Sequence, residues 1–225
     1  MRGYGQYCPV ALGAEIFAER WTPIIIRNLM LGCHRFGEIL DGAPGLPRSV
    51  LSQRLHHLGT AGVIVRTRTT GGGPSYELTP AGRELGDVCL ALGAWAARWR
   101  ETRPVDLDPY LALWMLARLI DPRALPRARV VVRFDLTDRA KPNRYWLVAD
   151  RTDSEICAEF PGFDEDGIVV ADADWLIRWH TGRVRLSTAI EDGGIQVNGP
   201  PWLLRLLTTW GALSPYASIA QAPVG

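Results

Sequence analysis

Residues 46–58 read Leu-Pro-Arg-Ser-Val-Leu-Ser-Gln-Arg-Leu-His-His-Leu, and this stretch decides the fold. Its apolar residues recur three and four positions apart, which predicts an amphipathic helix that packs one face on a core. Pro47 stands where a proline is tolerated in the first turn of a helix, and Gly59 and Gly62 suit the helix exit. The sequence therefore predicts a helix with one apolar and one polar face.

The polar face of this helix contains no acidic residue. Arginine, serine, glutamine and histidine are the side chains that bind base edges and phosphates in DNA complexes. We expect base-edge contacts from Ser49, Ser52, Gln53 and His56. We expect phosphate or minor-groove contacts from Arg35, Arg48, Arg54, Arg66 and Arg68.

A β-hairpin is predicted directly after this helix. Residues 63–68 alternate in polarity, the pattern breaks at three glycines and Pro74, and it resumes at residues 76–78. The alternation places Val63 and Val65 inward and Ile64 outward with the arginines. A basic hairpin beside a basic helix can follow a phosphate backbone, so the pair together predicts DNA binding.

The elements around this pair complete a known pattern. Helices are predicted over 11–19, 22–31 and 36–40, and a long helix runs from Pro80 to Trp99. In this order, residues 8–99 resemble the HxlR-type branch of the MarR-like winged-helix transcriptional regulators. The matching residues include Cys8-Pro9-Val10, Arg20-Trp21-Thr22, Leu29-Met30-Leu31-Gly32, Arg35-Phe36-Gly37-Glu38-Ile39, Leu51-Ser52-Gln53-Arg54-Leu55 and Tyr76-Glu77-Leu78-Thr79-Pro80. The resemblance implies a repressor that binds a palindromic double-stranded operator as a homodimer.

The long helix also indicates a dimer independently. Its apolar residues at 3-4-3-4 spacing are Leu85, Val88, Leu92, Trp95 and Trp99. Such a stripe is more often intradomain core, but the winged-helix core is already complete without it, so a seam between two subunits is favoured. Two-fold pairing would place the two DNA-reading helices about 34 Å apart, in successive major grooves.

Length and charge divide the chain in two. Its 225 residues are too many for one winged helix, and we expect domains at 1–103 and 104–225. Residues 1–103 carry 12 Arg or Lys and 8 Asp or Glu, a net charge of +4, whereas residues 104–225 carry 13 and 16, a net charge of −3. The basic part is the part that contains the predicted DNA-binding helix. No signal peptide or membrane-spanning run is visible, so we expect a cytoplasmic protein that does not contact membrane.

The second domain is predicted to be α+β, with a mostly antiparallel sheet and late helices. A helix over 110–120 precedes strands over 130–136, 145–149, 155–160, 167–171 and 195–197, with helices over 174–180 and 200–210. This order resembles the sterol carrier protein-like fold, through Tyr145-Trp146-Leu147-Val148, Asp174-Trp175-Leu176, Thr181-Gly182 and the stretch 194–200. The resemblance implies a hydrophobic cavity for a small apolar or aromatic effector.

Aromatic residues concentrate in this domain, which contains six of the nine tryptophans. They are equally typical of a packed core and of an aromatic-lined pocket. The candidate ligand-binding residues are Phe134, Trp146, Trp175, Trp179 and Trp202.

No catalytic or metal-binding motif accompanies these features. The chain lacks G-x-S-x-G, a P-loop and H-E-x-x-H, and its four cysteines form no C-x-x-C pair. We therefore expect no enzyme activity, no cofactor and no metal.

Two switches and one rival function stay open. An effector could act through the second domain. Alternatively, Cys8 could sense oxidants or electrophiles, because it precedes Pro9 at a helix start where a thiolate is favoured. The rival is a lipid- or metabolite-carrying module that uses its winged helix for protein contacts and has no DNA function.

Overall fold

The computed structural model describes residues 3–68, 71–101, 103, 106–211 and 214–220. The chain divides into two compact units, Met1–Gly93 and Ala94–Gly225, and the division falls within one long helix. The domain boundary predicted at 103 and 104 lies beyond that helix, where residues 102, 104 and 105 are outside the described residues. The architecture is α+β, as the sequence predicts.

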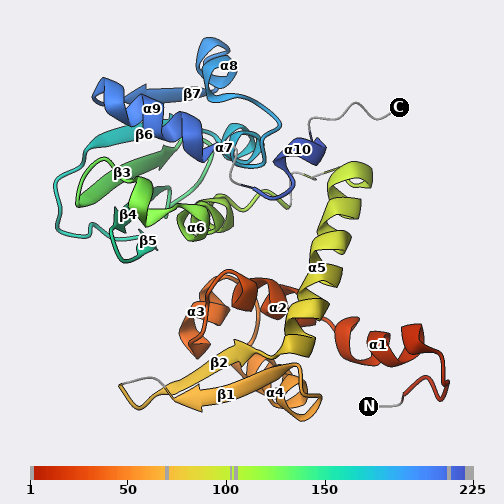
Figure 1. Ribbon diagram of the computed structural model, residues 1–225. Helices are drawn as coiled ribbons and strands as arrows, with labels where there is room; N and C mark the ends of the chain where they lie inside the picture. Colours follow the sequence, from red (N-terminus) through yellow and green to blue (C-terminus); the bar gives the residue numbers. More distant parts are fainter. Residues whose placement is uncertain (1–2, 69–70, 102, 104–105, 212–213, 221–225) are drawn as a thin grey trace. The chain divides into compact units, whose positions relative to one another are not determined.

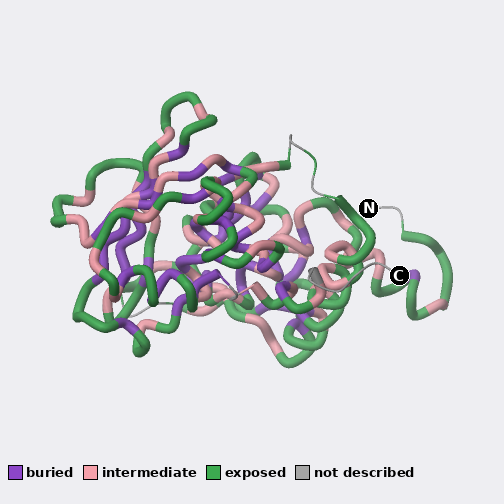
Figure 2. Tube along the Cα trace, turned by 90° about the horizontal axis from the view of Figure 1, so that it is seen from above, coloured by how far each residue is buried: buried purple, intermediate pink, exposed green. Residues whose placement is uncertain are grey.

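The first unit contains helices followed by a two-stranded wing and the long helix (Figure 1). Its elements are α1 (Pro9–Phe17), α2 (Thr22–Met30), α3 (Phe36–Asp41), α4 (Arg48–Thr60), β1 (Ile64–Arg68), β2 (Pro74–Leu78) and α5 (Pro80–Trp99). Its fully buried side chains include Ile25 and Ile26 of α2, Ile39 of α3 and Leu51 of α4. The segment from Gly3 to Tyr7, before α1, is exposed (Figure 2).

A buried amide fixes α2 against α3. Asn28 is fully buried, and its Nδ2 donates to the carbonyl of Ile39 at 2.8 Å. The Asn28 Oδ1 accepts from the Arg27 guanidinium at 2.8 and 3.0 Å. Because a buried polar group without partners is costly, these bonds define how the two helices dock.

The inward face of the wing differs from the prediction. Ile64 is buried, with 4% of its surface exposed, whereas Val65 is 45% exposed. Val63 is buried too, but it precedes the strand, and its amide donates to the carbonyl of Leu58 at the end of α4. The alternation of the strand therefore begins at Ile64, which reverses the predicted positions of Ile64 and Val65.

One junction joins α4, the wing and α5. The carbonyl of Val63 accepts from the backbone amide and the hydroxyl of Thr79, each at 3.1 Å, and the hydroxyl also reaches the carbonyl of Gly62 at 2.7 Å. The same hydroxyl accepts from the amide of Gly82 in the first turn of α5. A Cβ at Gly82 would lie 2.1 Å from the Val63 oxygen, so only glycine permits this approach.

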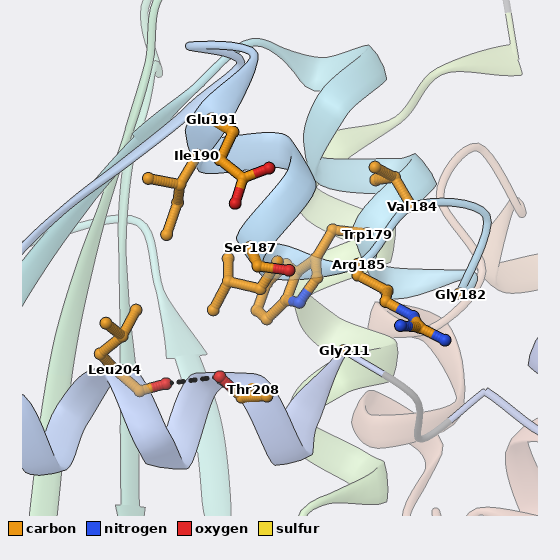
Figure 3. Close-up of a pocket in the computed structure, with 11 residues that line it drawn as sticks. Trp179, Gly182, Val184, Arg185, Ser187, Ile190, Glu191, Leu204, Thr208 and Gly211 are labelled. Atoms are coloured by element: carbon orange, nitrogen blue, oxygen red, sulfur yellow. Dashed lines mark hydrogen bonds between the residues drawn. The ribbon is translucent and has the colours of Figure 1, made fainter.

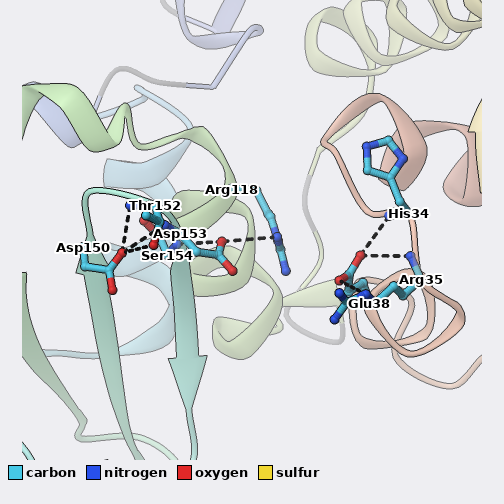
Figure 4. A network of polar contacts seen from close by, with 8 residues as sticks. All are labelled: His34, Arg35, Glu38, Arg118, Asp150, Thr152, Asp153 and Ser154. Carbon is cyan, nitrogen blue, oxygen red and sulfur yellow. Dashed lines mark hydrogen bonds and ion pairs between the residues drawn. The ribbon is translucent and has the colours of Figure 1, made fainter. Parts of the chain in front are cut away.

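The second unit is a five-stranded mixed sheet with helices. Its elements are α6 (Pro109–Leu119), η2 (Pro122–Ala124), β3 (Arg129–Leu136), β4 (Arg144–Asp150), β5 (Ser154–Cys157), β6 (Gly167–Ala171), α7 (Ala173–His180), α8 (Leu186–Glu191), β7 (Ile195–Asn198), α9 (Pro201–Trp210) and α10 (Ala217–Ala220). The strand order is β5-β4-β3-β6-β7, and only the β3–β6 pair is parallel among the described strands. At the β4–β5 turn, the Asp150 carboxylate accepts from Thr152 and Asp153, which lowers the pKa of Asp150 (Figure 4).

The two faces of this sheet have different surroundings. Phe134 of β3 belongs to the main core, where residues of α6, α7 and α9 pack on the sheet. Val131, Trp146 and Val148 form a small cluster on the opposite face. His180, at the end of α7, is buried, and desolvation lowers its pKa to about 4, so its ring is neutral near pH 7.

Among the described residues, no helix is both long and apolar enough to cross a membrane. The same part of the chain contains no cluster of three or more histidine, cysteine or acidic side chains arranged to hold a metal ion.

The glycine junction gives a direct stability prediction. We expect Gly82→Ala to lower the free energy of unfolding by about 1–3 kcal/mol, because the new methyl group would collide with backbone that cannot yield. Gly59→Ala is the matched control, since Gly59 also lies in a helix but its Cβ would meet nothing within 4 Å. That change should be neutral or stabilising by up to about 1 kcal/mol. Thermal unfolding followed by circular dichroism measures both, and equal effects would contradict the role of the junction.

Candidate nucleic-acid interface

Helix α4 presents a polar face because its apolar face is anchored. Leu51, Leu55 and Leu58 are buried, which fixes the rotation of the helix on the core. The opposite side chains, which the sequence predicts as base-edge contacts, are all exposed: Ser49, Ser52, Gln53 and His56. The structure therefore brings the four predicted contacts together on one accessible surface.

Arg48 begins α4 and Arg35 precedes α3, and the two arginines have different support. The Arg48 guanidinium carbon lies 5.0 Å from the centre of the Phe36 ring, so α3 supports this arginine through a cation–π contact. The side chain of Arg35 is 69% exposed, and its ion pair with Glu38 is long, at 3.8 Å. The Glu38 carboxylate is instead held by the amides of His34 and Arg35, at 2.8 and 2.9 Å (Figure 4). The sequence did not predict that Phe36 supports Arg48.

Arg54 does not belong to this surface. Its Nη2 lies 2.7 Å from the Glu19 carboxylate, its Nε donates to the carbonyl of Arg20, and its side chain is only 14% exposed. The guanidinium thus attaches α4 to the segment between α1 and α2. The predicted phosphate contact at Arg54 is not supported, because spacing along a helix does not reveal a partner 35 residues away.

The wing places two further arginines beside α4. Arg66 and Arg68 of β1 are exposed, and β2 pairs antiparallel with that strand, with Arg66 opposite Tyr76. The Tyr76 amide donates to the His34 carbonyl at 2.8 Å, which also connects β2 to the start of α3. The wing tip predicted around 69–73 includes Thr69 and Thr70, which lie outside the described residues.

A hollow of about 450 Å³ separates α4 from the wing. Ser52 and His56 line it from α4, and Arg66 and Tyr76 line it from the wing. Hydroxyl, imidazole and guanidinium groups are the donors that phosphate and sugar oxygens accept from. The arrangement suits a sugar-phosphate backbone that passes between helix and wing.

Comparison with known proteins places the N-terminal part of the chain in a family. Residues 16–104 match the model of the HxlR-like helix-turn-helix family. The chain is 32% identical over 99 residues to the HTH-type transcriptional regulator sll1512 of Synechocystis. The matched region is 43% of this chain and 73% of that protein. The chain is 33% identical over 104 residues to the regulator YvaP of Bacillus subtilis, covering 45% and 96%. The chain belongs to the HxlR-like helix-turn-helix family of transcriptional regulators.

A solved structure of a related regulator gives a partial alignment. The reduced form of YodB from B. subtilis aligns with a TM-score of 0.38 and 31% identity, over 43% of this chain and 97% of that chain.

Family membership decides between a DNA-binding regulator and the rival functions. An HxlR-family regulator is a DNA-binding protein and not an enzyme, which excludes the carrier module without a DNA function. The family model ends at residue 104, so it describes the winged-helix part. The structure shows a mixed sheet with helices in the C-terminal domain. The resemblance of this domain to the sterol carrier protein-like fold stays a prediction.

Helix α5 exposes the apolar stripe that the sequence predicts as a dimer seam. Its packed side carries Gly86, where a Cβ would lie 2.9 Å from the sulfur of Met30, and Cys89, whose Sγ donates to the carbonyl of Pro23. Partial burial raises the pKa of the Cys89 thiol. The stripe itself is open to solvent: Leu85 is half-buried, and the exposed fractions are 48% for Val88, 47% for Leu92, 52% for Trp95 and 62% for Trp99.

Cys8 lies half-buried at the position before the first turn of α1, with Pro9 following as the sequence suggested. Its carbonyl accepts from the amide of Leu12, which starts the helix. The structure thus confirms the local setting of this thiol and leaves its reactivity a prediction.

The five predicted ligand-binding residues do not share one cavity. Phe134 and Trp179 are in the main core, Trp146 is on the opposite face of the sheet, and Trp175 and Trp202 pack at the edge of the main core. Trp146 donates to Glu165 at 2.8 Å, and Trp175 and Trp202 stack with Arg178 and Arg127. Of the five, only Trp179 lines the largely apolar pocket of this unit.

The ion pair of Arg54 predicts a folding defect and not a specific binding defect. We expect Arg54→Ala to lower the free energy of unfolding by about 1–3 kcal/mol, because it leaves the Glu19 carboxylate partly buried without its partner. Arg66→Ala, at an exposed arginine, should change stability by less than about 0.5 kcal/mol. Urea unfolding of the two variants measures the difference, and an unchanged midpoint for Arg54→Ala would return that residue to the list of phosphate contacts.

Proposed function

We propose that this HxlR-family regulator represses transcription by binding a two-fold symmetric operator as a homodimer. Helix α4 enters the major groove with Ser49, Ser52, Gln53 and His56 toward the bases, and the wing follows the backbone. The observation that carries the proposal is the exposed, acid-free polar face of α4 beside Arg66 and Arg68. Arg35 and Arg48 extend the same positive surface past the start of α4.

The dimer is supported by apolar surface on two helices of the first unit. Besides the stripe on α5, residues at and before the start of α1 are exposed, with Tyr7 at 96% and Val10 at 79%. Monomeric proteins rarely present so many large apolar side chains to water. A second copy of the chain is the natural occupant, because a two-fold interface pairs each such surface with itself.

The regulatory signal is proposed to reach the chain through the C-terminal domain. A small apolar effector must bind the DNA-competent and DNA-incompetent states with different affinities to shift their populations. Helix α5 continues from the winged helix into the second unit and is the element that both domains share. Thiol sensing through Cys8 stays the alternative, and a Cys8→Ser variant that keeps the parental response to diamide excludes it.

The DNA interface is tested by fluorescence anisotropy on DNA upstream of the gene, with a salt series and a scrambled competitor. We expect the double variant Arg66→Ala/Arg68→Ala to bind all sequences more weakly. The salt slope of the dimer should fall by about 2–4, because the two subunits lose two guanidinium groups each and every group that neutralises a phosphate contributes about one to the slope. Gln53→Ala should instead change sequence preference, at about 1–3 kcal/mol for the base it reads.

The control for this experiment is Arg205→Ala, which removes an exposed arginine from α9 of the C-terminal domain. It should bind as the parent does. A parental salt slope in the wing variant, or an equal loss of affinity in the control, would contradict the proposed interface.

The dimer is tested by changing the middle of the stripe. We expect Trp95→Glu to convert the dimer into a monomer in analytical ultracentrifugation, because the carboxylate would be buried without a partner at the seam. Asp87→Arg is the matched control, since Asp87 is exposed on the same helix and lies outside the stripe. If Trp95→Glu sediments as the parental dimer does, α5 is not the interface.

A further inference from the structure

A pocket of about 400 Å³ lies among α7, α8 and α9 of the C-terminal domain (Figure 3). Trp179 and Leu186 form its buried floor, and Ile190 and Leu204 contribute apolar walls. Its volume is within the range of small-molecule sites, and its position was not predicted from the sequence.

The floor holds a donor without an acceptor. Trp179 is 1% exposed, and its indole Nε1 has no hydrogen-bond partner in the part of the chain that the structure describes. This nitrogen faces Gly211, where a Cβ would lie 2.1 Å from it (Figure 3). The bare backbone of Gly211 therefore packs against this nitrogen at the edge of the pocket, and the N–H is buried without an acceptor among the described residues. A buried N–H without a partner is costly, so the site favours a ligand that supplies an acceptor oxygen.

The rim adds charge at both ends of α8. Arg185, which precedes α8, is exposed and makes no ion pair among the described residues, and Ser187 follows it in the first turn. Glu191 lines the pocket from the far end of the same helix. Thr208 is occupied, because its hydroxyl donates to the carbonyl of Leu204 at 2.9 Å (Figure 3). The free donors are thus Trp179, Arg185 and Ser187, and the opposing acid is Glu191.

We propose that this pocket is the effector site and that its ligand is a small apolar acid, with a ring or alkyl body on Trp179 and Ile190 and an anionic oxygen toward Arg185. The inference rests on the proposed function, in which the C-terminal domain binds an apolar effector, and it names the site and the ligand class. Guanidinium and indole N–H groups are both donors only, so together they select an anion over an apolar cation.

A matched pair of dyes tests the pocket on the full-length protein. The probe is 1-anilinonaphthalene-8-sulfonate, and N-phenyl-1-naphthylamine is the same aromatic body without the anionic group. We expect one sulfonate dye to bind per chain, and to bind more tightly than the neutral dye.

Two substitutions on α8 locate the dye. Ser187→Trp fills the pocket from an exposed position, whereas Thr188→Trp adds the same side chain at the next exposed residue, which does not line the pocket. Ser187→Trp should abolish dye binding and Thr188→Trp should keep it. Equal binding by both variants overturns the proposed site, including the case in which the dye binds the stripe on α5.

Charge variants test the ligand class. Arg185→Gln should weaken the sulfonate dye about tenfold and leave the neutral dye unchanged, as expected for one charge-assisted contact. Glu191→Gln should strengthen the sulfonate dye only. If Arg185→Gln changes neither dye, or if the neutral dye binds as tightly as the anion, the anionic class is wrong.

The same variants separate this inference from the proposed function. Thr188→Trp should retain parental operator affinity in the absence of dye, because Thr188 does not line the pocket and is remote in sequence from α4 and the wing. Loss of dye binding by Ser187→Trp, with dye and DNA binding both retained by Thr188→Trp, supports the site. Parental dye binding by Ser187→Trp overturns the site and leaves the DNA interface standing.

Discussion

The carbonyl oxygen of Val63 is the atom on which the geometry of the winged helix depends. It accepts two hydrogen bonds from Thr79 and lies under the bare backbone of Gly82, so the end of α4, the end of the wing and the start of α5 meet at one point. Because the contacts of the Val63 carbonyl with Thr79 and Gly82 are close-packed and involve backbone atoms, these segments can shift little relative to one another. The distance between the polar face of α4 and Arg66 on the wing is therefore set by the junction, and with it the width of the hollow that we assign to DNA.

Arginine serves three different purposes around that junction. Arg54 forms an ion pair with Glu19 inside the fold. Arg48 stacks on the ring of Phe36, and Arg66 is exposed. Only the exposed and stacked guanidinium groups remain available to an external phosphate. The excess of positive charge in the first part of the chain is thus an upper limit on the DNA-binding charge, because part of it is used to hold the fold together.

The C-terminal domain shows why an abundance of aromatic residues is a poor guide to a pocket. Neighbouring strands place Phe134 and Trp146 on opposite faces of the sheet, so the two cannot line one cavity. Trp175 and Trp202 cover the edge of the core and stack with arginines. The pocket instead forms among α7, α8 and α9, where the bare backbone of Gly211 packs against the indole nitrogen of Trp179.

The matching residues of the first part indicated the family by resemblance. The pattern of the sequence also determined most of the elements, although not α8, together with the polar face of α4 and the apolar stripe of α5. These depend on residue periodicity, which is local and is preserved in the fold. Only the tertiary structure decided that Ile64 of the wing is buried and Val65 is exposed. It also decided that Arg54 pairs with Glu19 and which tryptophan lines a pocket. Each of these depends on contacts between residues that are distant in the sequence or on a strand boundary shifted by one residue, and periodicity contains no information about either.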